Sequence, residues 1–293
     1  MVAVDEFSRL VSGIYAAAVT PQHWEPALHE IRRALGGAVG SLTGEAANGM
    51  WQIQATTAPP DVPKTYAEHY YRLDYVLAGL KNGPVGAVRT GTELVAPGTN
   101  TEFYNDWMRP NDFGDGLFVS MTDGQRLSCL IVTSPRRTES FDTPDRVKLM
   151  GALIPHLQQA MRTQSKLTAL ADRTAELASA LNAVRHGIVL VGSECWVLDL
   201  NAAAEAILRT HDGVHVYAGR LGAENRLTER KLYRALHAAL VGDSSDTRSG
   251  RSLICERPSG KRPYVIHVLP LQRTSSDEIP TDTRALVLIT DPE

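Results

Sequence analysis

The sequence predicts an α+β protein in which a long helix joins two antiparallel-sheet domains. Three observations lead to this fold class. The length of 293 residues exceeds that of a typical single domain and fits two, each large enough to bury its own core. Short strand-like runs flank turn sequences in both halves of the chain. Between them, residues 143–184 keep apolar side chains at helical spacing.

Composition and charge are those of a soluble globular protein. Hydrophobic residues make up 43% and charged residues 22% of the chain, and the formal net charge is -3. Lysines and arginines form no clustered positive excess of the kind that grips a phosphate backbone. No apolar run approaches the roughly 20 residues of a spanning helix, and the first residues lack the basic start of a secretory signal. We therefore expect a cytoplasmic protein with no membrane association.

The three cysteines also fit a reducing compartment. Cys129, Cys195 and Cys255 are far apart, and each lies in an apolar strand-like run. No CxxC pair or basic neighbourhood accompanies them. We expect three buried thiols without a redox or metal role.

The first domain, residues 1–142, is predicted to begin with two helices and to continue as a sheet of hairpins. Residues 4–18 repeat apolar side chains at helical spacing, and a second helix starts after Pro21 and ends at Gly36-Gly37. Asn-Gly and Asp-Gly dipeptides suit tight hairpin turns. The predicted strands are 39–43 and 51–56 around Asn48-Gly49, and 117–121 and 127–133 around Asp123-Gly124. With helices inserted on one side, this sheet forms an α+β sandwich.

The segment between the two hairpins carries the candidate binding site. Residues 64–80 are predicted as one helix that places tyrosines and leucines on one face and Asp74 next to it. Only 6% of the chain is aromatic, so the gathering of rings here and around residues 103–113 exceeds the background. Aromatic walls with a nearby carboxylate are typical of a small-molecule pocket. The candidate ligand-binding residues are Tyr66, Tyr70, Asp74, Phe103, Trp107 and Phe118.

The same rings could instead build ordinary core, because a helical aromatic stripe is more often packing than recognition. Asp74 separates the two interpretations, since a carboxylate beside such a stripe needs a partner if it is buried.

Residues 143–184 are predicted as one long helix, with Thr143 as its cap and Pro144 in its first turn. Pro155 removes one helical hydrogen bond and should kink the helix near Gly151. At 1.5 Å per residue, a helix of roughly 40 residues would span about 60 Å, too long to pack within one small domain. Its apolar stripe either packs back on its own domains or pairs with the same helix of a second copy. We favour a homodimer through this helix.

The second domain, residues 185–293, is predicted as a five-stranded antiparallel sheet with helices over one face. Strands at 187–191 and 195–200 precede Asn201, which is placed to cap a short helix at 202–210. A longer amphipathic helix carries leucines at helical spacing, from Leu227 to Leu240. The three remaining strands are predicted at 251–256, 264–269 and 283–290.

The sequence contains no recognisable catalytic or metal-binding motif. There is no GxGxxG, P-loop, GxSxG or HExxH sequence, and the histidines are scattered. His211, Asp212 and His215 lie close together, but two histidines and one carboxylate in a loop are usually only polar. We expect no catalytic residues, no metal and no cofactor.

Some of these residues resemble known sensor families. Residues 187–205, with two apolar strands, Asp199 and then Asn201-Ala-Ala-Ala-Glu205, resemble the opening of a PAS domain. The segment before it, which ends in residues 154–160, is similar to a GAF-type domain. The combination resembles the sensory portion of bacterial LuxR-type transcriptional regulators, in which such domains precede a helix-turn-helix. Autoinducer-binding members place an aromatic residue, a Tyr and an Asp on one helical stretch, a pattern that Tyr66, Tyr70 and Asp74 match loosely. Tyr75 departs from it, since those members usually have Pro at this position.

The resemblance implies a ligand-sensing, dimerising region that would relay binding of a small molecule to a DNA-binding domain. Residues 1–142 would be the ligand-sensing GAF-like domain, 143–184 the dimerisation helix and 185–293 the PAS-like domain. No helix-turn-helix follows residues 286–293, so we expect contact with DNA only through a domain outside this sequence. Two other functions remain open. One is a structural dimerisation or protein-interaction module without a ligand, and the other is an enzyme on the first domain.

Overall fold

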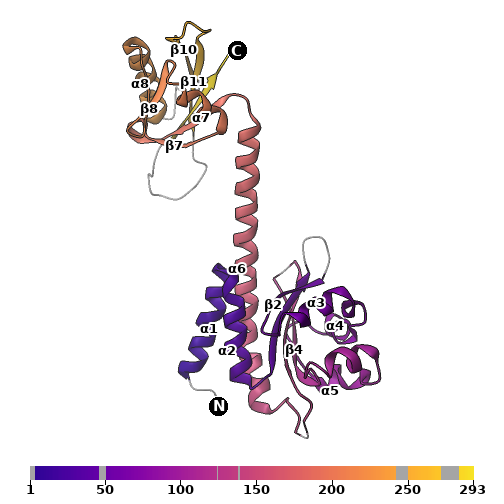
Figure 1. Ribbon diagram of the computed structural model, residues 1–293. Helices are drawn as coiled ribbons and strands as arrows, with labels where there is room; N and C mark the ends of the chain where they lie inside the picture. Colours follow the sequence, from indigo (N-terminus) through magenta and orange to yellow (C-terminus); the bar gives the residue numbers. More distant parts are fainter. Residues whose placement is uncertain (1–3, 46–50, 124, 138, 242–249, 272–283) are drawn as a thin grey trace. The chain divides into compact units, whose positions relative to one another are not determined.

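The computed structural model describes residues 4–45, 51–123, 125–137, 139–241, 250–271 and 284–293. The chain divides into two compact units, Met1–Ala171 and Asp172–Glu293, each considered by itself below. Each unit combines helices with a five-stranded antiparallel sheet (Figure 1). The predicted α+β fold class is therefore confirmed.

The first unit begins with the two predicted helices. Helix α1 spans Val4–Val19, a short 3-10 turn η1 spans Pro21–His23, and α2 spans Trp24–Leu35. Helix α2 ends where Gly36 adopts a φ of 69°, a left-handed conformation that glycine enters without steric cost. The predicted stop at Gly36-Gly37 is confirmed.

The sheet of the first unit has the strand order β2-β1-β5-β4-β3. Both predicted hairpins are present, because β1 pairs with β2 and β4 pairs with β5, all antiparallel. Asn48-Gly49 and Gly124, which were expected in their turns, lie outside the described residues. A short strand, β3, was not predicted. The bounds are β1 Val39–Glu45, β2 Trp51–Thr56, β3 Val88–Thr90, β4 Asp115–Thr122 and β5 Leu127–Ser134.

Both faces of this sheet are covered, which corrects the prediction of helices on one side only. On one face, Leu42, Leu130 and Val119 pack with apolar residues of α1, α2 and the first part of α6. On the other face, Phe118 and Cys129 pack with residues of the segment inserted between the hairpins. Figure 1 shows helices of this segment on the side of the sheet opposite α1 and α2. Since alternate residues of a strand point to opposite faces, each central strand contributes to two cores.

The inserted segment consists of several short helices, so the prediction of one helix over residues 64–80 is wrong. His69 leaves the helical conformation, with φ -137° and ψ -55°, and ends α3. Asp74 then begins α4 as its N-cap, because its carboxylate accepts the N–H of Leu77 at 2.8 Å. The segment comprises α3 Asp61–Glu68, η2 Tyr70–Arg72, α4 Tyr75–Lys81, α5 Gly91–Leu94, η3 Ala96–Gly98 and the π-helix η4 Phe103–Met108.

Helix α6 spans Pro144–Ala183 and continues through Pro155. The residues of its first part, from Leu149 to Met161, include seven buried side chains that belong to the core of the first unit. Its later apolar side chains are exposed in the single chain: Leu167 44%, Leu170 61%, Leu177 58% and Leu181 46%, with Val184 37% just beyond the helix. The stripe therefore packs back on the first unit only over its first part.

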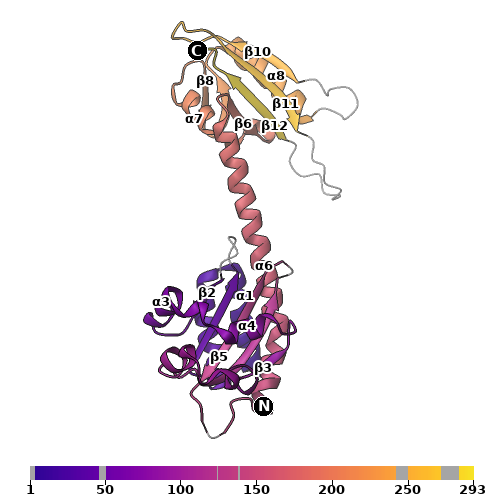
Figure 2. The ribbon, with the colours of Figure 1, turned by 90° about the vertical axis from the view of Figure 1, so that its right-hand side faces the viewer.

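The second unit contains the predicted five-stranded antiparallel sheet, and its strand order is β10-β11-β12-β6-β7. Figure 2 shows α8 lying across one face of β10, β11 and β12. A separate hairpin, β8-β9, was not predicted. The bounds are β6 Gly187–Val191, η5 Ser193–Cys195, β7 Val197–Leu200, α7 Ala202–Arg209, β8 Val214–Tyr217, β9 Arg220–Ala223, α8 Arg226–Val241, β10 Arg251–Cys255, β11 Tyr264–Leu271 and β12 Arg284–Thr290.

Asn201 caps α7 as predicted, because its Oδ1 accepts the N–H of Ala204 at 2.9 Å. The same oxygen accepts the N–H of Ile188 at 2.8 Å, and its Nδ2 donates to the carbonyls of Leu181 and His186 at 2.9 Å and 3.0 Å. One side chain thereby holds the end of α6, the start of β6 and the start of α7 together.

None of the helices that the structure describes is long and apolar enough to cross a bilayer.

Candidate ligand pocket

A pocket lies in the first unit between the sheet and the inserted helices. It holds about 540 Å³ of space free of protein atoms, counting the part open to solvent. Its wall is mostly apolar but includes one carboxyl group, three Ser or Thr hydroxyls and one phenol. The lining residues are Val39, Ser41, Thr43, Ile53, Tyr66, Asp74, Val76, Leu77, Phe103, Trp107, Met108, Phe113, Phe118, Ile131 and Thr133.

Four strands form the floor of the pocket. Thr43 of β1 lies opposite Ile53 of β2, and Ser41 of β1 lies opposite Ile131 of β5. Ile131 in turn lies opposite Phe118 of β4. Residues directly opposite each other in an antiparallel sheet share one face, so the pairing itself brings these side chains to the pocket.

Asp74 and Tyr66 provide the polar contact on the helical side. Tyr66 donates its hydroxyl hydrogen to Asp74 Oδ2 at 2.8 Å, while Asp74 Oδ1 holds the N–H of Leu77. Burial of the carboxyl group raises the pKa of Asp74 from 3.8, although these hydrogen bonds favour the carboxylate. Asp74 as a whole residue is only partly buried, whereas its carboxyl group is largely removed from water. Asp74 lines the pocket. Burial and the nearby Asp74 also raise the pKa of Tyr66, which therefore keeps its proton.

The π-helix η4 supplies the aromatic wall. Phe103 and Trp107 stack with ring centroids 5.1 Å apart and an interplanar angle of 20°. Trp107 also lies 5.2 Å from Tyr66 and 5.2 Å from Phe113, measured between centroids. Its Nε1 donates to Thr65 Oγ1 at 3.2 Å, so the ring is held at its polar edge. Wide helical turns of this kind often occur at functional sites.

Five of the six candidate residues line the pocket: Tyr66, Asp74, Phe103, Trp107 and Phe118. Tyr70 does not. It lies in the 3-10 turn η2, partly buried, with its ring 6.0 Å from Trp107 and 6.3 Å from Phe103 between centroids. The break between α3 and α4 removes Tyr70 from the face that a continuous helix would have given it.

Sequence reasoning missed the hydroxyl groups of the floor. Ser41, Thr43 and Thr133 all line the pocket, and Thr43 Oγ1 is buried without a hydrogen-bond partner among the described residues. The available signal was the alternation of the small polar residues Ser41 and Thr43 with Leu42 in the predicted strand 39–43. The candidate site was placed instead in the segment between the hairpins and its flanking rings, and helices were expected on one face of the sheet only.

The three cysteines are buried, as expected, and form no disulfide with one another. Burial raises the pKa of Cys129 to about 12 and that of Cys255 to about 11, and it also raises the pKa of Cys195. Thiols with raised pKa values are poor nucleophiles at neutral pH. Within the described ranges, no group of three or more His, Cys, Asp or Glu side chains is arranged to hold a metal ion.

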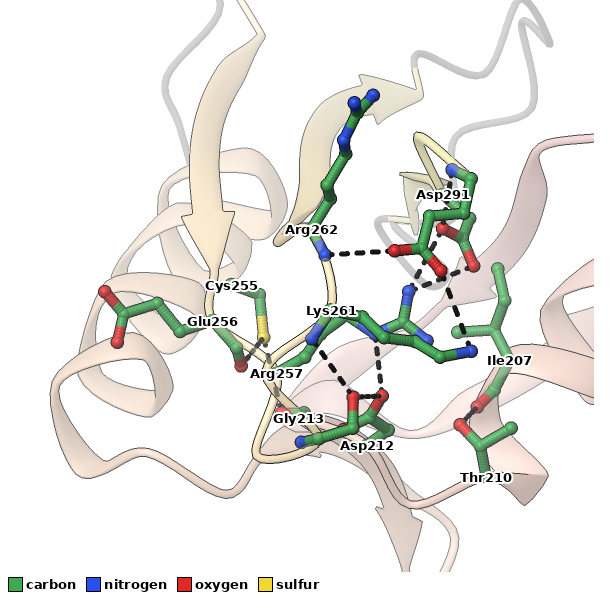
Figure 3. A network of polar contacts seen from close by, with 12 residues as sticks. Ile207, Thr210, Asp212, Gly213, Cys255, Glu256, Arg257, Lys261, Arg262 and Asp291 are labelled. Atoms are coloured by element: carbon green, nitrogen blue, oxygen red, sulfur yellow. Dashed lines mark hydrogen bonds and ion pairs between the residues drawn. The ribbon is translucent and has the colours of Figure 1, made fainter.

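The second unit contains a separate polar cluster around Arg257, whose side chain is 4% exposed (Figure 3). Its Nε donates to Asp212 Oδ2 at 2.7 Å, and its Nη1 donates to Asp291 Oδ1 at 3.1 Å. Its guanidinium carbon lies 4.2 Å from the centroid of the Tyr264 ring. Asp212, considered above together with two histidines, thus serves as an arginine partner.

The hydrogen bonds of this cluster shift the pKa values of Asp212 and Arg257. Ser259 donates both its hydroxyl and its N–H to Asp212, and these contacts, followed by Arg257, lower the pKa of Asp212 to about 2. Burial alone would lower the pKa of Arg257, but Asp212 and the other partners outweigh it. The cluster ties the loop after β10 to the residues after β12, and we interpret it as a structural clamp.

Comparison with known proteins gives likeness of fold only. No family model and no curated protein matches the sequence. Among solved structures, the VqsR LBD domain from Pseudomonas aeruginosa is 17% identical, with a TM-score of 0.45, over 54% of this chain and 96% of that one. CepR2 from Burkholderia cenocepacia, an N-acylhomoserine lactone dependent LuxR family transcription factor, is 16% identical, with a TM-score of 0.41, over 54% and 94%.

A third solved structure extends over both units. The E. coli DhaR(N)-DhaL complex matches 99% of this chain and 91% of its own, at 12% identity and a TM-score of 0.39. PAS and GAF domains are also among the similar structures. The solved structures that resemble this chain thus include LuxR-family, PAS and GAF sensor domains. At these identities and scores they carry no argument about ligand or partner, which must come from the residues of this chain.

Proposed function

We propose that this chain is the ligand-sensing and dimerising region of a bacterial regulator of LuxR type, with a small molecule bound in the pocket of the first unit. The observation that carries the proposal is the pocket itself. It combines an aromatic wall, a desolvated carboxyl group and a buried hydroxyl without a partner. Protein interiors are normally close-packed, and their buried polar groups are normally paired. A space with these properties is better suited to a guest than to core packing.

The position of the pocket suggests how ligand binding could affect helix α6 within the first unit. Phe118 of β4 lines the pocket, whereas its neighbours Leu117 and Val119 lie in the core that includes Leu153 and Leu157 of α6. One strand therefore separates the ligand from the helix. A ligand would shift α6 between two arrangements only by its difference in affinity for them. Any effect on transcription would pass through a DNA-binding domain joined to or recruited by these units.

Dimerisation through α6 is the second part of the proposal. Leu167, Leu170, Leu177, Leu181 and Val184 are all more than a third exposed in the single chain. A row of exposed leucines at three- and four-residue spacing is typical of a helix that pairs with another. A second copy of the same helix would bury the row.

The alternative is an interaction module that dimerises without a ligand, for which the exposed stripe of α6 is the supporting observation. In that case the pocket would be closed by small movements of its own side chains.

Ligand screening against a blocked pocket separates the two functions. Ile53, partly buried on the pocket floor, is changed to Trp to fill the space, and the adjacent exposed Gln52 is changed to Trp as the control. Metabolites that bind the native pocket should raise the melting temperature of the wild type and of Gln52→Trp, but not of Ile53→Trp. If the wild type binds no metabolite, or if Ile53→Trp responds like the wild type, the pocket is not the sensor.

A further inference from the structure

The hydroxyl group of Thr43 is an unusual feature of the pocket floor. Thr43 is 5% exposed, and its Oγ1 has no hydrogen-bond partner among the described residues. A buried hydroxyl without a partner costs stability, and buried side-chain polar atoms are usually paired. Thr43 is nevertheless one of the residues that line the pocket, whose wall is mostly apolar.

The other polar groups of the pocket already have partners. Ser41 Oγ and Thr56 Oγ1 are 2.7 Å apart, and Thr133 Oγ1 donates to the carbonyl of Val39 at 3.5 Å. Asp74 holds Tyr66 and the N–H of Leu77, one on each oxygen. Thr43 is thus the lining group whose hydrogen-bonding capacity is entirely unused among the described residues.

The sheet does not offer Thr43 a strong partner. Its two cross-strand neighbours are Ile53 on β2 and Cys129 on β5. An isoleucine side chain cannot form hydrogen bonds, and a thiol is only a weak donor and acceptor. A strong partner must therefore come from within the pocket.

We propose that Thr43 is the polar recognition point of the ligand, which is a neutral, mainly apolar molecule carrying a hydroxyl or carbonyl oxygen. That oxygen would bond to Thr43 Oγ1 while the apolar part packs against Phe103, Trp107 and Phe118. The molecule is neutral because the described residues that line the pocket include no Lys, Arg or His to balance an anion. A cation is disfavoured because both oxygens of the one carboxyl group, that of Asp74, already accept hydrogen bonds from Tyr66 and Leu77. This inference rests on the proposed function, and the tests below separate the two.

The first test needs no ligand. Thr43→Val keeps the branched shape and removes the hydroxyl, so it should raise the melting temperature of the full chain by roughly 2 °C or more. Ser41→Ala is the matched control, because it removes a pocket hydroxyl that already has a partner, and it should lower the melting temperature. If Thr43→Val is as destabilising as Ser41→Ala, the hydroxyl has a partner of its own and the inference fails.

The second test uses two probes of the same shape, p-cresol and p-xylene, with affinities measured by calorimetry. The preference for p-cresol over p-xylene should be about threefold to tenfold greater in the wild type than in Thr43→Val. Thr43→Ser, which keeps the hydroxyl, should keep the wild-type preference. An equal preference in wild type and Thr43→Val overturns the role of Thr43 but leaves the pocket as a binding site. Failure of both probes to bind overturns the proposed function and this inference with it.

Discussion

Asp74 has a carboxyl group whose surroundings favour the neutral form. Its pKa is raised chiefly by burial, against the opposing hydrogen bonds of Leu77 and Tyr66. A group whose pKa is higher in the folded than in the unfolded state binds more protons when folded. The free energy of unfolding therefore falls as pH rises from about 3.8 through the raised value. The proton on Asp74 thus contributes to stability at low pH, and this contribution is lost as pH rises.

The matched substitution is Asp74→Asn, which keeps the cap acceptor for Leu77 and has no charge to desolvate. The stability of the wild type minus that of Asp74→Asn should decrease as pH rises above about 3.8, as measured by urea unfolding at a series of pH values. A difference that stays constant or grows with pH would show that the carboxylate is stabilised by its surroundings.

Helix ends and hairpin pairings are the elements that could be predicted from the sequence, because their signals are local. Gly36 and Asn201 end and begin helices where expected, and both predicted hairpins of the first unit are present. The break between α3 and α4 and the π-helix η4 could not be predicted in this way. Apolar spacing fits one helix over residues 64–80 equally well, and the choice depends on packing of the rings against the sheet.

The sequence therefore predicted the aromatic wall of the candidate site but not its floor. The aromatic wall could be predicted because rings are rare in this chain and gather in one segment. The floor could not be predicted, since Ser41 and Thr43 alternate with buried Leu42 and so look like the solvent side of a strand. Only the covering of both faces of the sheet turns these hydroxyls inward, and that is a property of the tertiary fold.

Asn201 is the connection between α6 and the second unit, and its four hydrogen bonds use both ends of the amide. Asn201→Asp keeps the acceptor but replaces the donor with an oxygen that faces the carbonyls of Leu181 and His186. We expect a loss of about 2–4 kcal/mol in the free energy of unfolding of this unit. Asn225 is the control, because it is an exposed cap whose Oδ1 accepts the N–H of Leu227 at 2.8 Å. Asn225→Asp should change stability by less than about 0.5 kcal/mol, since Asp is as good a cap as Asn.

Chemical denaturation followed by Trp196 fluorescence, in variants that lack the other tryptophans, would report on the second unit alone. If Asn201→Asp and Asn225→Asp change the free energy of unfolding equally, the amide N–H groups of Asn201 add no stability beyond that of its helix cap.

At the scale of the whole molecule, the later part of α6 carries a row of exposed apolar side chains. Its apolar positions alternate by three and four residues from Leu167 to Val184, with Thr174 in the same series. This spacing matches the a and d positions of a left-handed coiled coil, where each side chain inserts between four residues of the facing helix. The surrounding positions are exposed and polar or small, so a single chain leaves the row in water.

Dimerisation through this row predicts a sharp difference between two double variants of the same helix. Leu177→Glu with Leu181→Glu places charges in the seam, whereas Ala175→Glu with Ser179→Glu places the same charges at exposed positions outside it. Glutamate is a good helix former, so both variants should keep the helix. In sedimentation equilibrium, the wild type and the Ala175/Ser179 variant should be dimers and the Leu177/Leu181 variant a monomer. Buried like charges at neighbouring core positions should prevent the helices from pairing there, so a Leu177/Leu181 variant that remains dimeric would contradict the seam. A wild type that stays monomeric at all concentrations would contradict it as well.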